Sequence, residues 1–153
     1  MSLTPCLTLA GKAQEMAEYY TDVFPDGVVD DMMRTPGADG DETVLTASIR
    51  LNGTSILILN GPDNTPNDSF SFIINCKDQA EVDHFWNRFV NDGGEEIMCG
   101  WCRDKFGYSW QVTPEEMPSL LNDPDPERGR KAFEAMMTMK KIDLAAIKAA
   151  MDA

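Results

Sequence analysis

The sequence predicts an α+β protein built from two tandem βαβββ modules followed by a C-terminal helical extension. The first observation is an internal repeat: aligning Glu15 with Glu81, an offset of 66 residues, superimposes two helical stripes without gaps. The second is that strand-like segments flank both stripes, and the third is a purely helical pattern after Pro114. The superimposed pairs are Met16 with Val82, Tyr19 with Phe85, Tyr20 with Trp86, Val23 with Phe89, and Phe24 with Val90.

The first module is predicted over about residues 3–60. Residues 3–9 alternate between apolar and polar side chains, as expected of a half-buried strand, and residues 12–24 carry the first helical stripe. The Pro25-Asp26-Gly27 run stops this helix, and Asn52-Gly53 predicts a tight hairpin turn. The remaining elements are strands over residues 28–34, 43–51 and 55–59, with a polar loop over residues 36–41.

The second module is predicted over about residues 69–113, after a linker over residues 61–68 that is rich in Pro, Asn and Asp. Residues 70–76 form the first strand and residues 79–90 the helix. The segment 99–114 predicts a hairpin, with a turn at residues 104–107 and a strand over residues 108–113.

The helical tail is predicted over residues 115–152, so that residues 1–153 form one domain. Its helices are expected over residues 115–121, 127–140 and 142–151, broken by Asp123-Pro124-Asp125-Pro126. Phe133, Met136, Met137 and Lys140 share one helical face, which indicates core packing; a subunit contact is the alternative.

Composition excludes several function classes. The formal charge of −13, from 26 acidic and 13 basic residues, argues against nucleic acid or an anionic membrane as partner. No apolar run approaches the roughly 18 residues of a membrane span, and no basic-then-apolar leader is present. The four cysteines, too few for a disulfide scaffold, fit reduced thiols in the cytoplasm.

Several segments resemble PhnB-like proteins of the glyoxalase, or vicinal oxygen chelate, superfamily. They are Thr4-Pro5-Cys6-Leu7-Thr8-Leu9, the Tyr19-Tyr20-x-x-Val23-Phe24 helix end, the Asp104 to Pro114 run preceded by Cys99-Gly100-Trp101, and the Met139 to Asp143 tail. The resemblance covers nearly the whole chain. It implies two curled modules that form a cleft, often with a divalent metal, and a chain that pairs as a homodimer.

The resemblance puts the metal-ligand positions at Cys6, Leu57, Phe72 and Gln111, and the internal repeat gives the same four. Leu57 and Phe72 have no donor atom, and Cys6 with Gln111 is too small a set for a hard or borderline cation. We therefore expect no metal and no other cofactor, with a divalent metal as the disfavoured alternative. A register error of one residue brings in Ser71 or Ile58, which does not restore a site.

Two further motifs favour structural roles. The single histidine, His84, lies off the apolar stripe of its helix and is expected to be a solvated surface side chain. A Cys-His or Ser-His catalytic dyad would then have no histidine to act as its base. Cys99-Gly100-Trp101-Cys102 spells C-x-x-C but leads into a strand rather than a helix, so a redox role is disfavoured. Cys102 then acts as a small buried apolar residue.

The cleft is expected to bind a small organic ligand, with no catalytic residue assigned. The candidate contacts are Thr4, Cys6, Thr8, Phe70, Phe72, Trp101, Arg103, Ser109 and Gln111. Trp101 and Arg103 would stack on the ligand and meet an anionic end. The alternatives are plain core positions for the aromatic residues and a surface pair of Arg103 with Asp104.

These residues are compatible with two functions, one of which is enzymatic. One is a ligand-binding protein without metal chemistry; the other is a metal-dependent or thiol-assisted enzyme using Cys6 or Gln111. PhnB-like proteins are often labelled 3-demethylubiquinone-9 3-methyltransferases. The sequence has no G-x-G-x-x-G turn of the kind that binds a dinucleotide-like cofactor, so it gives this label no support.

Overall fold

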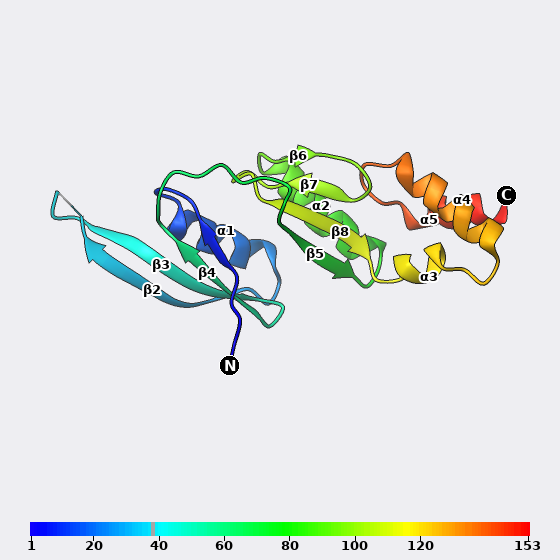
Figure 1. Ribbon diagram of the computed structural model, residues 1–153. Helices are drawn as coiled ribbons and strands as arrows, with labels where there is room; N and C mark the ends of the chain where they lie inside the picture. Colours follow the sequence, from blue (N-terminus) through cyan, green and yellow to red (C-terminus); the bar gives the residue numbers. More distant parts are fainter. Residues whose placement is uncertain (38) are drawn as a thin grey trace. The chain divides into compact units, whose positions relative to one another are not determined.

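A computed structural model describes residues 1–37 and 39–153, and Figure 1 shows its helices and strands. The chain divides into two compact units, residues 1–65 and 66–153. Each unit carries one βαβββ module, which confirms the predicted fold class. The elements are β1 (Cys6–Thr8), α1 (Ala13–Val23), β2 (Val28–Pro36), β3 (Glu42–Leu51) and β4 (Thr54–Leu59), then β5 (Ser71–Cys76), α2 (Gln79–Asn91), β6 (Glu95–Glu96), β7 (Trp101–Arg103) and β8 (Ser109–Pro114), then α3 (Met117–Leu121), α4 (Pro126–Met137) and α5 (Leu144–Asp152).

The sheet of the first unit has the strand order β1-β4-β3-β2. The first strand pairs in parallel with the last, with Cys6 opposite Leu57, and the other pairs are antiparallel. Asn52 and Gly53, with φ of 46° and 75°, make the predicted two-residue turn between β3 and β4. Ala38, in the loop predicted over residues 36–41, lies outside the described residues.

Helix α1 lies on one face of this sheet and buries its predicted apolar stripe. Met16, Tyr20 and Val23 are fully buried together with Ile49 and Ile58 of the sheet. The first strand is shorter than the predicted residues 3–9 because Pro5 has no N–H to donate; it only accepts a hydrogen bond, from the Leu57 N–H.

The second unit repeats this topology with the strand order β5-β8-β7-β6. Asp78 caps the N-terminus of helix α2, and its side chain accepts a hydrogen bond from the Glu81 N–H at 2.9 Å. Three stacked aromatic rings join the helix to the sheet: the Trp110 ring centroid lies 4.8 Å from Phe72 and 4.7 Å from Phe89. The two-residue strand β6 was not predicted, because two consecutive glutamates carry no alternating pattern.

The three C-terminal helices enclose a separate apolar cluster. Its buried members are Met117, Ala132, Ile142, Leu144, Ile147 and Met151. Of the predicted Met-rich face of α4, Met136 packs against this cluster, whereas Phe133 and Met137 are about half exposed, at 51% and 49%. The core-packing interpretation is therefore right for Met136 and wrong for the other two apolar residues. Helix α4 ends at Met137 rather than at the predicted residue 140.

Within residues 1–37 and 39–153, no helix is both long enough and apolar enough to span a membrane.

Candidate functional site

The sheet of the second unit has two chemically different faces. Phe72 and Trp110 are register partners on the face that α2 covers. Because side chains alternate along a strand, the neighbours of these two residues point the other way. We call that side the open face; it carries Ser71, Ile73, Trp101, Arg103, Ser109 and Gln111, which the register places opposite one another.

The placement of Phe72 corrects a prediction. The sequence repeat aligned Phe72 with Cys6 and put it on the ligand side, but its ring stacks on Trp110 on the helix side. The helix-facing residue of β1 is the buried Leu7, so Leu7 rather than Cys6 is the counterpart of Phe72. The two helices align at an offset of 66 residues, but the two first strands align at 65. This difference of one residue moves every side chain of the predicted strand to the opposite face. Phe70 packs edge-on against Phe72, with ring centroids 5.0 Å apart.

Arg103 is the centre of a charged network on the open face. Its Nε and Nη2 donate to the two carboxylate oxygens of Asp68, at 3.1 and 2.6 Å, and Nη1 donates to Glu95 at 3.0 Å. Ser109 Oγ donates to Asp68 at 2.5 Å. The hydrogen bonds from Arg103, and then that from Ser109, lower the pKa of Asp68, while those to Asp68 and Glu95 raise the pKa of Arg103.

This network shows that the alternative interpretation, a surface pair of Arg103 with Asp104, was wrong. Consecutive strand residues point to opposite sides, and the Asp104 carboxylate is buried, where it accepts a hydrogen bond from the Trp110 indole N–H at 2.8 Å. Asp68 and Glu95 were not predicted as site residues. No sequence signal marks them, because Asp68 lies 35 residues before Arg103 in a linker.

The other half of the open face combines apolar and polar groups. Gln111 Nε2 donates to Ser71 Oγ at 2.9 Å, and Trp101 lies opposite Gln111 in the register. Ile73, also opposite Gln111, is 56% exposed. The structure therefore brings four predicted residues together here, Trp101, Arg103, Ser109 and Gln111, and adds Ser71 and Ile73.

The first-unit candidates lie on and beside β1. Cys6 is exposed, Thr8 is partly buried, and the intervening Leu7 is buried, so Cys6 and Thr8 share the sheet face away from α1. Thr4 is exposed and precedes the strand. The register places Cys6 opposite Leu57 and Thr8 opposite Leu59, so their sheet neighbours on β4 are leucines.

The residues at the implied metal positions do not fit a metal ion. Leu57 has only a hydrocarbon side chain, Phe72 belongs to the ring stack, and the Gln111 amide is bonded to Ser71. Across residues 1–37 and 39–153, no three His, Cys, Asp or Glu side chains form a group that could hold a metal ion.

The cysteines differ in environment, although all four are free. Burial raises the pKa of the Cys76 and Cys102 thiols to about 12, so both are protonated at neutral pH. Cys99 has φ of +56° in the turn before β7, and its Sγ lies 3.6 Å from Met137 Sδ. A protonated, fully buried Cys102 opposes a redox role for the C-x-x-C motif.

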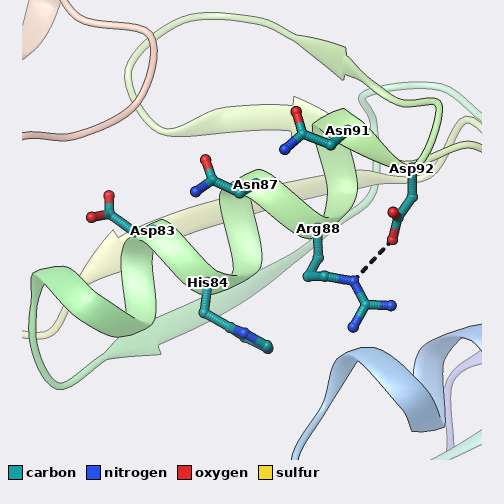
Figure 2. A pocket seen from close by; sticks show the side chains of 6 residues that line it. All are labelled: Asp83, His84, Asn87, Arg88, Asn91 and Asp92. Carbon is teal, nitrogen blue, oxygen red and sulfur yellow. Dashed lines mark hydrogen bonds and ion pairs between the residues drawn. The ribbon is translucent and has the colours of Figure 1, made fainter.

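A shallow depression of about 380 Å³ runs along the outer, polar side of α2, and Figure 2 shows its lining. The six lining residues are Asp83, His84, Asn87, Arg88, Asn91 and Asp92. His84 is exposed, as predicted. Three of the lining residues already form ion pairs, because Asp83 pairs with Lys141 at 2.8 Å and Arg88 pairs with Asp92 at 3.0 Å. All the lining comes from one helix, which makes the open face the better-formed candidate.

Comparison with known proteins gives a family and a fold. A family model described as 3-demethylubiquinone-9 3-methyltransferase matches residues 1–113. A PhnB protein from Bacillus cereus is 27% identical, with a TM-score of 0.62 over 72% of this chain and 97% of that one. None of the curated proteins compared with the chain matches it.

Two more distant structures share the fold. Protein PA1353 from Pseudomonas aeruginosa is 19% identical, with a TM-score of 0.60 over 72% of this chain and 94% of that one. The fosfomycin resistance protein FosX from Listeria monocytogenes is 12% identical, with a TM-score of 0.51 over 72% of this chain and 89% of that one.

Proposed function

Because the chain belongs to the 3-demethylubiquinone-9 3-methyltransferase family of PhnB-like proteins, within the glyoxalase or vicinal oxygen chelate superfamily, we propose that it binds a small organic ligand without a metal ion. The proposed site is the open face of the second sheet. Binding is proposed because the open face presents polar and apolar contacts whose side chains hold one another in place.

One observation carries the proposal: polar and apolar groups alternate across a single sheet face with defined geometry. The Gln111 and Ser71 side chains are held by their mutual hydrogen bond, and Trp101 and Ile73 flank Gln111 on either side. A few fixed polar groups among apolar side chains are typical of sites for small organic molecules. Thr4, Cys6 and Thr8 remain candidates for ligand contact on the first sheet.

Nuclear magnetic resonance of the isotope-labelled chain tests the proposal. We expect small aromatic and aliphatic compounds to shift the signals of Ser71, Trp101 and Gln111. Gln111→Leu keeps the side-chain size and removes its hydrogen bonds, so the affinity should fall about fivefold. Gln14→Leu is the matched control, because Gln14 is an exposed glutamine bonded to Glu18 on α1. Compounds that shift only the α2 residues, or none at all, would refute the proposed site.

The second candidate is a thiol-assisted or metal-dependent enzyme of the superfamily. The exposed Cys6 thiol on the open side of β1 favours it. Turnover of a methyl donor or another small substrate that Cys6→Ser abolishes would put this candidate ahead of simple binding.

We also propose that the protein acts in the cytoplasm and that two copies of the chain form a homodimer. The four free cysteines support a reducing compartment. The half-exposed Phe133 and Met137 of α4 supply apolar surface for pairing. Light scattering at high protein concentration tests the pairing, and a monomer that persists there contradicts it.

A further inference from the structure

Resting on the proposed function, we propose that the ligand of the open face is a small organic cation: an amine or quaternary ammonium attached to an apolar body. This reverses the expectation that Arg103 meets an anionic end. The charge, the aromatic surface and the hydrogen-bond acceptors of this face all favour a cation.

The charge balance of the open face is negative. The Arg103 guanidinium is engaged on three of its nitrogens, by both oxygens of Asp68 and by Glu95. Two carboxylates surround one guanidinium, so one negative charge is left in excess. An anionic ligand that approached the remaining N–H groups of Arg103 would lie beside both carboxylates and be repelled by them, whereas a cation is attracted without breaking any bond.

Strand β7 carries no cation besides Arg103. The next residue with a positive side chain, Lys105, holds its ammonium 5.1 Å from the centroid of the Phe106 ring. The formal charge of the whole chain, −13, also attracts cations toward the protein at low salt.

The aromatic and apolar surface lies next to these carboxylates. Trp101 is two residues before Arg103 on β7, so their side chains share the open face. A tryptophan ring attracts a cation over its face, and this attraction is larger for Trp than for the other aromatic residues. Ile73, opposite Gln111, offers contact for the apolar body.

Gln111 supplies an acceptor beside Trp101. Its Nε2 donates a hydrogen bond to Ser71 Oγ, and the amide oxygen, Oε1, points away from that bond. Within the described part of the chain, no hydrogen bond reaches the Gln111 Oε1 atom. An ammonium N–H needs such an acceptor, whereas a carboxylate ligand would be repelled by it.

A matched set of three probes tests the charge of the ligand. Phenethylammonium, phenethyl alcohol and hydrocinnamate share a phenyl ring and a two-carbon chain and differ in the charge of the end group. We expect phenethylammonium to shift the Trp101 and Gln111 signals with an affinity at least about threefold above the alcohol. Hydrocinnamate should bind most weakly, and added salt should reduce the difference.

Glu95→Gln provides the mutational test. Glu95 is exposed and makes one bond to Arg103, so the variant removes one charge and leaves the Asp68 bonds in place. Phenethylammonium should then bind about threefold more weakly and hydrocinnamate more tightly. Glu134→Gln is the control, since Glu134 and Glu127 flank Arg130 on α4 in the same way.

The outcomes separate this inference from the proposed function. If the alcohol or hydrocinnamate binds the open face as tightly as the cation, the charge inference is wrong and ligand binding there stands. If phenethylammonium leaves the open face unshifted while neutral compounds bind it, the charge inference is again wrong. If no compound of any charge shifts the open face, the proposed function fails with it.

Discussion

The indole Nε1 of Trp110 donates a hydrogen bond of 2.8 Å to the carboxylate of Asp104, and both side chains are almost completely buried. The other carboxylate oxygen accepts from the backbone N–H groups of Phe106 and Tyr108. One aspartate therefore fixes the β7–β8 turn and anchors the ring that stacks between Phe72 and Phe89.

We expect Asp104→Ala to lower the free energy of unfolding by about 3 kcal/mol, because three donors lose their acceptor and the indole N–H stays buried. Asp104→Asn should cost less, since one amide oxygen still accepts. Urea unfolding measures both changes. A loss no larger than that of the exposed Asp30→Asn would contradict the anchoring role, because Asp30 makes only an exposed pair with Arg50.

Gln79 joins the second module to the C-terminal helices. Its Oε1 accepts from the Leu144 N–H and its Nε2 donates to the Ile142 carbonyl, each at 2.9 Å. Gln79→Ala leaves both backbone groups without this partner, and we expect about 1 kcal/mol of lost stability. Hydrogen exchange should accelerate in α5 more than in α1. Equal acceleration in both helices would show that the link is not local.

The thiols should react in an order set by their exposure. At about pH 8, the exposed Cys6 should be alkylated first, whereas Cys76 and Cys102 should react only on unfolding, since each combines burial with a pKa of about 12. Mass spectrometry after timed alkylation checks the order. Fast labelling of Cys102 in the folded chain would restore the redox interpretation of C-x-x-C.

The same two thiols predict a loss of stability at alkaline pH. An unfolded cysteine loses its proton near 9.0, whereas the folded thiols keep theirs to about 12, so unfolding releases protons in that window and stability falls as pH rises. At about pH 10 each thiol should lower the free energy of unfolding by about 1 kcal/mol. Cys102→Ala should have a flatter pH profile than the unchanged chain. Parallel profiles would contradict the raised pKa.

The purified protein should contain little bound metal. Elemental analysis, before and after incubation with zinc, manganese, iron or nickel and desalting, should give well below one metal per chain, because Leu57 and Phe72 offer no donor. About one metal per chain would show that other residues form the site and would make metal-assisted catalysis the leading function.

The local signals in the sequence predicted most of the elements. The Asn52-Gly53 turn and the apolar stripes of α1 and α2 were found because a turn and a helix depend on residues close in sequence. Strand faces were harder: the helix repeat was right, yet a slip of one residue put Phe72 on the wrong side of β5.

Contacts between distant residues could not be predicted. Arg103 was expected to meet an anionic ligand, with a surface pair to Asp104 as the alternative. Consecutive strand side chains point apart, and Asp68 and Glu95 reach the guanidinium instead. Ser71 was considered only as the residue that a one-residue register error would bring to a metal position. No sequence pattern pointed to Glu95 as a site residue. The polar half of the candidate site thus depends on tertiary structure that no local pattern encodes.

In each sheet the first strand pairs with the last strand to be synthesised, so the sheet can form only after the whole module has been translated. Cys6 has no partner until Leu57, 51 positions later, has been added. At roughly 5–20 residues per second, β1 must wait roughly three to ten seconds for β4. All the strands of the first sheet have then been synthesised before those of the second, so the nascent chain can form its two sheets one after the other.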